Sequence, residues 1–205
     1  MDSEWHRKAV GGLWEVVGDL QFELLLREGL KPQHRLLDIG CGSLRGGVHF
    51  IRYLDSGCYT GIDKSVERLD AGRNIELSRE DLVGKKPVLE VIDDFDFSLL
   101  NEKFDYAVAL SLFTHLPIEL IRLCLINTAE VLEPGARLFA TFFEIQSKGQ
   151  NRVFERSDRL YAKDPNFWFT FDELLVACDG TGLKADYVGN WGHPRNQKLV
   201  VFTKL

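Results

Sequence analysis

Apolar residues follow two spacings along the chain, and their alternation predicts a repeated order of strands and helices. Short apolar runs typical of buried strands recur between segments in which apolar residues return every three or four positions, as on one helix face. The predicted strands are 35–40, 58–63, 87–93, 104–110, 137–144, 183–188 and 198–203. The predicted helices are 13–26, 46–54, 65–77, a segment that begins after Pro117, and 171–180.

Helix boundaries are indicated by particular residues. Ser65 is placed to cap the helix that follows it, and Thr170 opens a capping box with Glu173. Gly29 predicts the end of the first helix, and Pro134-Gly135 predicts the end of the helix that begins after Pro117.

This order predicts a single α/β domain over residues 1–205, built on a doubly wound mixed sheet of about seven strands with helices on both faces. The last two strands have no helix between them, so we expect the last strand to run antiparallel. Residues 1–34 are expected to form an N-terminal helical cap. Residues 145–169 exceed an ordinary loop and are expected to be an insertion that acts as a substrate lid.

Charge and composition exclude several classes of partner. The net charge is -6 and the sequence pI is about 5.4, which disfavours a broad nucleic-acid surface or a membrane-surface role. The chain has no apolar run of about eighteen residues and no secretory h-region, so we expect a cytoplasmic protein without a membrane contact. The 4 cysteines are scattered without metal-ligand spacing, which predicts reduced thiols and no metal site.

A glycine turn follows the first predicted strand and points to a nucleoside-type cofactor. The turn is Asp38-Ile39-Gly40-Cys41-Gly42, and Asp63 ends the next strand, where its carboxylate could accept ribose hydroxyls. Arg45 occupies the position of the third glycine in a dinucleotide fingerprint, which disfavours a nicotinamide-dependent dehydrogenase. The acid before the glycines fits a cationic ligand better than a pyrophosphate.

With these residues in place, the chain resembles the class I S-adenosylmethionine-dependent methyltransferases. The turn is similar to their first motif, and Asp63 matches the acid that closes their second strand. Their later motifs are matched in order by 91–95, by 104–108 through 111–116, and by 132–138. The segment Ser111-Leu112-Phe113-Thr114-His115-Leu116 is similar to one found in small bacterial enzymes often associated with methylation of sugars or other small molecules. The resemblance implies a Rossmann-like fold and S-adenosylmethionine as cofactor, with no metal.

The resemblance also implies roles for the residues that match its motifs. Asp38 would contact the cofactor's ammonium group, Asp63 its ribose, and Asp94, or alternatively Asp93, its adenine amino group. The full set of predicted cofactor-binding residues is Asp38, Gly40, Cys41, Gly42, Arg45, Asp63, Lys64, Asp93, Asp94, Phe95 and Ser111.

The acceptor side is predicted from histidines and from the insertion. His115 follows the fourth strand and is the first candidate for a catalytic base, with His193 the second. Each histidine has a structural alternative, as a helix cap or packing residue for His115 and as part of a rigid hairpin connection for His193. Arg156, Arg159 and Tyr161 are predicted to bind an anionic or sugar-phosphate acceptor, with a solvated loop face as the alternative.

The predicted function is therefore methylation of an oxygen, less favourably a nitrogen, on a small polar acceptor such as a sugar. A methyltransferase-like domain that binds the cofactor without turnover is one alternative, and a protein acceptor is another. Ser111-Leu112-Phe113-Thr114 stands where amino-methylating enzymes carry Asn/Asp-Pro-Pro-aromatic, so nucleic-acid methylation is disfavoured. The sequence does not fix the oligomeric state.

Overall fold

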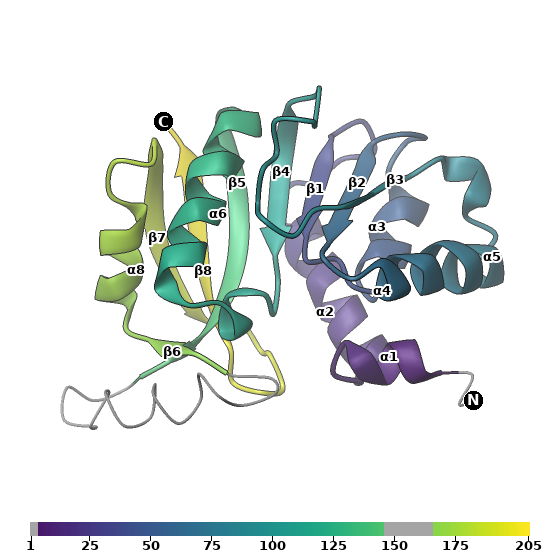
Figure 1. Ribbon diagram of the computed structural model, residues 1–205, viewed down its shortest axis with the longest axis horizontal. Coiled ribbons are helices and arrows are strands. Elements are labelled where there is room, and N and C mark those ends of the chain that lie inside the picture. Colours follow the sequence, from purple (N-terminus) through teal and green to yellow (C-terminus); the bar gives the residue numbers. More distant parts are fainter. Residues whose placement is uncertain (1–3, 146–165) are drawn as a thin grey trace.

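The computed structural model describes residues 4–145 and 166–205, which form a layered α/β fold around one eight-stranded sheet (Figure 1). The strand order is β3-β2-β1-β4-β5-β8-β7, and β6 pairs with β5 beside this path. The strands are β1 Leu36–Ile39, β2 Tyr59–Asp63, β3 Val88–Val91, β4 Phe104–Ala109, β5 Leu132–Glu144, β6 Trp168–Phe169, β7 Leu183–Asn190 and β8 Lys198–Lys204.

The pairing directions confirm the predicted mixed sheet. Strands β3, β2, β1, β4 and β5 pair in parallel, whereas β8 is antiparallel to both β5 and β7. The last strand is therefore the antiparallel one, as expected. The two-residue strand β6, parallel to β5, has no counterpart in the prediction.

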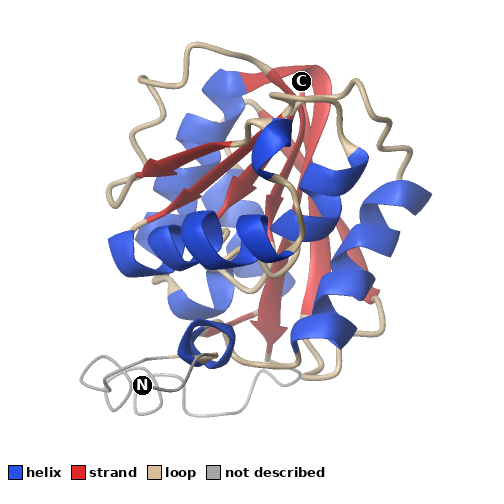
Figure 2. Ribbon diagram, turned by 90° about the vertical axis from the view of Figure 1, so that its right-hand side faces the viewer, coloured by secondary structure: helices blue, strands red, loops and turns tan. Residues whose placement is uncertain are grey.

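Helices cover both faces of this sheet (Figure 2). They are α1 Trp5–Ala9, α2 Trp14–Arg27, α3 Gly47–Tyr53, α4 Val66–Ala71, α5 Leu77–Arg79, α6 Ile118–Val131 and α8 Phe171–Cys178. One apolar core joins the sheet to α2 and α3 through residues such as Leu25 and Phe50. The other joins it to α6 and α8 through residues such as Leu125 and Leu174. The two cores hold the sheet fixed from both sides, so its strand ends are a rigid platform.

The helix starts confirm the capping predictions. The Ser65 hydroxyl accepts a hydrogen bond from the Arg68 backbone N–H at 3.2 Å. Thr170 and Glu173 form the complete capping box at the start of α8. Both signals are local, because each capping side chain bonds only to atoms of the first turn of its own helix.

The prediction that Pro134-Gly135 ends a helix is wrong. Helix α6 ends at Val131, and β5 begins at once with Leu132 and runs through the Pro-Gly pair. The β4–β5 ladder shifts register next to this pair, so the proline nitrogen, which cannot donate, disrupts no regular pairing.

Two departures from the prediction lie near the N-terminus and α4. The predicted helix 65–77 is interrupted by a π-helical turn, Gly72–Glu76, which leads into α5. Helix α1 was not predicted, and Leu13, expected inside the next helix, instead precedes α2 in the left-handed conformation with φ 49°.

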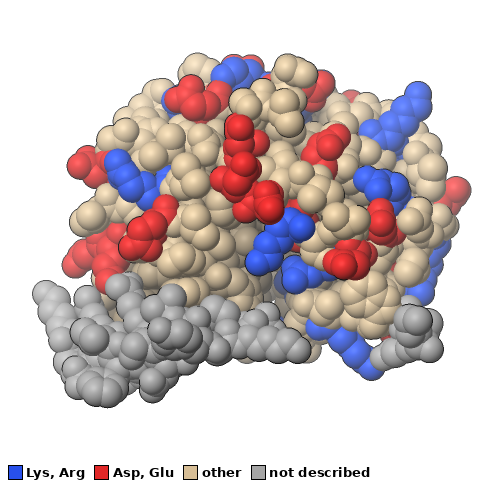
Figure 3. All heavy atoms as spheres, in the orientation of Figure 1, with Lys and Arg blue, Asp and Glu red and all other residues tan. Residues whose placement is uncertain are grey.

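The described surface carries both signs of charge. Figure 3 shows acidic and basic side chains interspersed over the face it views, without a broad field of either sign. Among the described residues, no helix has the length and apolar character that crossing a membrane requires.

Candidate functional site

The candidate site lies at the edge of the sheet where β1, β2 and β4 end. Strand β1 has β2 on one side and β4 on the other, so the chain changes direction across the sheet at this point. In open α/β sheets, ligands bind at the carboxyl ends of the strands beside such a reversal. The β7–β8 connection and helix α1 lie at the same edge (Figure 1).

The glycine turn after β1 is bound to Asp63 at the end of β2. The Gly42 backbone N–H donates to Asp63 Oδ2 and the Ser65 backbone N–H donates to Oδ1, both at 2.9 Å. Asp63 is buried, and Arg68 Nη1 lies 3.8 Å from its Oδ1. A carboxylate has about four lone-pair positions, so these bonds leave acceptor capacity for further hydroxyl donors.

The glycines are required because other segments lie directly on the turn. Gly40 and Gly42 have φ of 76° and 57°, which favours glycine. A Cβ at Gly40 would lie 3.0 Å from Leu112, and one at Gly42 only 2.6 Å from Val10 Cγ1. The turn is thus covered by the loop after β4 and by the segment after α1. Neighbouring Cys41 is buried, and burial raises the pKa of its thiol well above the ordinary value.

Asp38 is buried in β1 and has a tyrosine partner that the sequence analysis missed. The Tyr59 hydroxyl donates to Asp38 Oδ2 at 2.7 Å. The pKa of Asp38 is raised to about 7, mainly by burial and also by the charge of Asp63, against the opposing effects of the Tyr59 hydrogen bond and the charge of Arg45. The available signal was the strand pairing: Tyr59 lies opposite Leu36, two residues before Asp38, and therefore on the same face of the sheet.

Arg45 fixes the segment after α1 onto the glycine turn. Its Nη1 donates to the Val10 carbonyl at 2.8 Å and to the Gly12 carbonyl at 3.2 Å. The side chain is buried, and its Nε has no hydrogen-bond partner among the described residues. Burial lowers the pKa of Arg45 to about 10, and the charge of Arg195 adds to this effect.

His193, in the β7–β8 connection, is buried next to these arginines. Its Nδ1 accepts from the Arg195 backbone N–H at 3.2 Å, and its ring stacks on Trp191 with centroids 5.5 Å apart. Its Nε2 has no partner among the described residues. Burial lowers the pKa of His193 to about 4, with smaller contributions from the charges of Arg45 and Arg195.

A polar network links the end of β4 to β5 and β8. The Ser111 N–H donates to Thr141 Oγ1 at 2.7 Å, and both hydroxyls donate to Gln197 Oε1, at 3.1 Å from Ser111 and 2.7 Å from Thr141. The network holds Ser111 in the left-handed region with φ 65°. His115 follows on the same turn and is exposed.

The ends of the insertion return to this edge. The Phe167 N–H donates to the Thr114 carbonyl at 2.8 Å, and the Ile145 N–H donates to the Phe169 carbonyl at 2.9 Å. The predicted acceptor residues Arg156, Arg159 and Tyr161 lie outside the described residues.

The residues predicted to contact adenine lie at the ends of β2 and β3. Lys64 and Asp93 are exposed. Asp94 Oδ1 accepts from the Asp96 N–H at 2.9 Å, which closes the turn after β3. Phe95 is half-buried and adopts φ 60°. Among the described residues, no group of three or more His, Cys, Asp or Glu is placed to hold a metal ion.

A buried ion cluster that the sequence analysis also missed fixes α1 to the π-helical turn. Glu76 is fully buried, and its carboxylate accepts from Arg7 Nε at 2.9 Å and Nη2 at 2.8 Å, with His6 Nε2 at 2.5 Å from Oε1. Hydrogen bonds from Arg7 and His6 lower the pKa of Glu76 against the opposing effect of burial.

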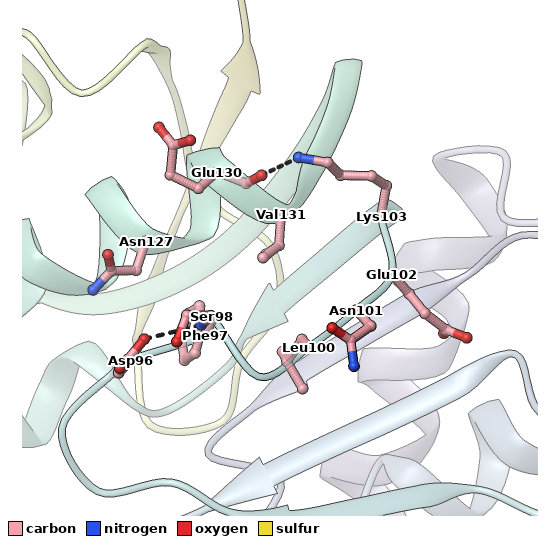
Figure 4. A pocket seen from close by; sticks show the side chains of 10 residues that line it. All are labelled: Asp96, Phe97, Ser98, Leu100, Asn101, Glu102, Lys103, Asn127, Glu130 and Val131. Atoms are coloured by element: carbon pink, nitrogen blue, oxygen red, sulfur yellow. Dashed lines mark hydrogen bonds between the residues drawn. The ribbon is translucent and has the colours of Figure 1, made fainter.

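A pocket of about 320 Å³ lies at the opposite edge of the sheet (Figure 4). It is bordered by residues such as Phe97, Lys103 and Val131, where β4 begins and α6 ends. It includes none of the candidate site residues.

Known proteins resemble this chain in sequence over part of its length and in fold over most of it. A sequence model described as a methyltransferase domain matches residues 37–138. Magnesium protoporphyrin IX methyltransferase from Synechocystis PCC 6803, solved with bound S-adenosylhomocysteine, is 13% identical with a TM-score of 0.67, over 93% of this chain and 83% of that one. An S-adenosylmethionine-dependent methyltransferase from Methanosarcina mazei is 20% identical with a TM-score of 0.65, over 88% and 97% of the two chains. The YcgJ protein from Bacillus subtilis is 13% identical with a TM-score of 0.70, over 90% and 97%.

Proposed function

Since this chain belongs to the class I S-adenosylmethionine-dependent methyltransferases, we propose that it methylates an oxygen of a small polar acceptor, a sugar or a related metabolite. The observation that carries this proposal is the position of His115. It is an exposed histidine on the turn after β4, at the edge of the sheet where β1, which carries Asp38, and β2, which ends at Asp63, also end. An imidazole there suits removal of a proton from a hydroxyl.

The residues at the ends of β1 and β2 fit the cofactor. Asp38 is a buried carboxylate suited to an ammonium group, and the hydrogen-bonded Asp63 retains acceptor capacity for two ribose hydroxyls. In this proposal Gly40, Cys41 and Gly42 line the methionine portion with Ser111 nearby. Lys64, Asp93, Asp94 and Phe95 contact the adenine.

Residues of the chain then have three tasks. When bound, S-adenosylmethionine supplies an electrophilic methyl group on a sulfonium. The glycine turn and the strand ends align the acceptor oxygen with the methyl group, and the covering segments exclude water. The Nε2 or Nδ1 atom of His115 accepts the hydroxyl proton as the oxygen attacks.

The insertion is proposed to complete the acceptor side. The bond from Ile145 to Phe169 joins its two ends, and the bond from Phe167 to Thr114 places them next to His115 in the loop after β4. Arg156, Arg159 and Tyr161 lie between these ends in the sequence. Alanine at Arg156 and Arg159 should raise the acceptor KM and leave cofactor affinity unchanged; an unchanged KM would remove them from the site.

The test is S-adenosylhomocysteine formation with a panel of sugars and small hydroxylated metabolites and their amino counterparts. We expect turnover with a hydroxyl acceptor and a fall in kcat of about 10²- to 10⁴-fold for His115→Gln. His34→Gln is the matched control, because the His34 ring lies 5.2 Å from the Tyr106 ring near the start of β4, away from the site. Turnover with amines alone would refute O-methylation, and an unchanged kcat in His115→Gln would show that positioning suffices without this base.

A further inference from the structure

The N-terminal segment and the β7–β8 connection meet over the glycine turn, and two arginines join them. Arg45 donates to the carbonyls of Val10 and Gly12, and Arg195 Nη2 donates to the carbonyl of Gly11. Two guanidinium groups are thus bound to three successive backbone carbonyls. Guanidinium donors prefer carboxylate or phosphate oxygens, which accept two parallel bonds and carry the opposite charge.

Two buried donors in this cluster lack an acceptor among the described residues. One is the Nε of Arg45 and the other is Nε2 of His193, in side chains that are 7% and 6% exposed. His193 Nδ1 accepts from the Arg195 N–H, so the proton of the neutral ring lies on Nε2. Nε2 is therefore a donor, and a buried donor without an acceptor is a position where a ligand oxygen would be stabilised.

The charges around this cluster favour an anion. Arg45 and Arg195 repel each other, and the charges of both add to the effect of burial in lowering the pKa of His193. Asp38 is the carboxylate whose charge acts on Arg45, and it is already engaged by Tyr59. A bound oxyanion would offset the repulsion between the two arginines.

We propose that Arg45, Arg195 and His193 form a subsite for an oxyanion group, carboxylate or phosphate, of the methyl acceptor. The oxyanion accepts from Arg45 Nε and His193 Nε2 and replaces the carbonyls of Val10 to Gly12 as the partner of the arginines. This inference rests on the proposed function, and it moves Arg45 from the cofactor's side of the site to the acceptor's. It gives His193 the role of a hydrogen-bond donor to the acceptor and not that of the base.

The test uses inorganic phosphate as the probe and the ring resonances of His193 as the readout. Phosphate is titrated into the full chain at pH 7, with and without saturating S-adenosylhomocysteine, while heteronuclear NMR follows the histidine ring nitrogens and carbons. We expect saturable shifts of His193 in the presence of S-adenosylhomocysteine, with the proton on Nε2 throughout.

Variants separate a built site from general charge attraction. Arg45→Lys keeps the charge but removes the Nε donor, so phosphate affinity should fall at least fivefold. Arg195→Gln, at an exposed side chain, should weaken phosphate similarly and leave S-adenosylhomocysteine affinity within twofold. Arg35→Gln is the control, since Arg35 pairs with Glu102 at the opposite edge of the sheet. Thermal unfolding midpoints confirm that each variant is folded.

Each other result overturns the inference. Phosphate binding only without S-adenosylhomocysteine would assign the subsite to the cofactor's carboxylate. If Arg35→Gln lowers phosphate affinity as much as the other two variants, or if phosphate causes no saturable shift of the His193 resonances, no such subsite exists. If the wild-type chain binds S-adenosylhomocysteine but not phosphate, this inference alone fails; if it does not bind S-adenosylhomocysteine, the proposed function fails.

Discussion

The raised pKa of Asp38 should make cofactor affinity depend on pH near neutrality, and Tyr59→Phe, which removes a hydrogen bond that lowers this pKa, should move the dependence to higher pH. Asp38 has a pKa of about 7, so about half of the molecules carry the carboxylate at neutral pH. The cofactor's ammonium group requires the charged form. Affinity should therefore rise as pH increases through 7 and then level off, because the pKa of this carboxyl is raised and its charged form dominates only above it.

The phenylalanine variant removes the one side-chain hydrogen bond, among the described residues, that lowers the pKa of Asp38. A hydrogen bond to a charged group contributes about 1.5–3 kcal/mol, equivalent to about one to two pKa units. At pH 7 the charged fraction would fall from about one half to between about 0.1 and 0.01, so affinity should fall about 5- to 50-fold. At pH 8.5 the difference should shrink to about fourfold or less.

Isothermal titration with S-adenosylhomocysteine between about pH 6 and 8.5 measures both effects. Tyr53→Phe is a matched control, because the Tyr53 hydroxyl donates to the Leu30 carbonyl away from the glycine turn. Equal affinities of Tyr59→Phe and wild type at pH 7, or a loss that persists undiminished at pH 8.5, would refute the reasoning.

Three further predictions concern the turn and the N-terminal segment. Asp63→Ala should lower S-adenosylhomocysteine affinity more than tenfold, about 1.4 kcal/mol or beyond, by calorimetry; undiminished binding would remove Asp63 from the site. Leu44→Gly relieves the strain of a φ of 73° but leaves a cavity at a fully buried position. Because the strain relief of about 1–2 kcal/mol is smaller than the cavity cost of about 2–5 kcal/mol, the variant should be less stable in urea unfolding. A gain in stability would show that the strain dominates. Glu76→Ala leaves Arg7 and His6 without their carboxylate, so trypsin should cleave after Arg7 faster while the remaining chain stays folded; an unchanged rate would show that the cluster does not hold α1.

Sequence reasoning predicted correctly the features that depend on residues close together in the chain. Ser65 and Thr170 cap their helices through atoms of the adjoining turn, so composition and spacing were sufficient. The parallel order of the first strands also followed, since helices between strands require crossover connections. The end of α6 was predicted wrongly from Pro134-Gly135, because a Pro-Gly pair is typical of a helix end and of a β-bulge alike. Only the β4–β5 register distinguishes the two.

The contacts that sequence reasoning missed join residues far apart in the chain. Tyr59 in β2 bonds to Asp38 in the neighbouring strand β1, and Glu76 bonds to Arg7, which lies 69 positions away in the sequence. Helix α1 has only five residues and precedes Gly11-Gly12, so it lacks the periodicity that predicts longer helices. Its stability comes from buried ionic contacts, which leave no local pattern in the sequence.

The place of β8 has a consequence for how the protein is made. β8 is inserted between β5 and β7, although it follows both of them, and every other described strand, in the chain. During synthesis, the long edge of β5 therefore stays unpaired until residues 198–204 leave the ribosome. An apolar unpaired edge is a template for association with other chains, so the nascent protein is exposed to aggregation during this interval. Arg195, which donates to the Gly11 carbonyl, lies just before β8 in the chain, so this contact between the β7–β8 connection and the N-terminal segment cannot form before that part of the chain has been synthesised.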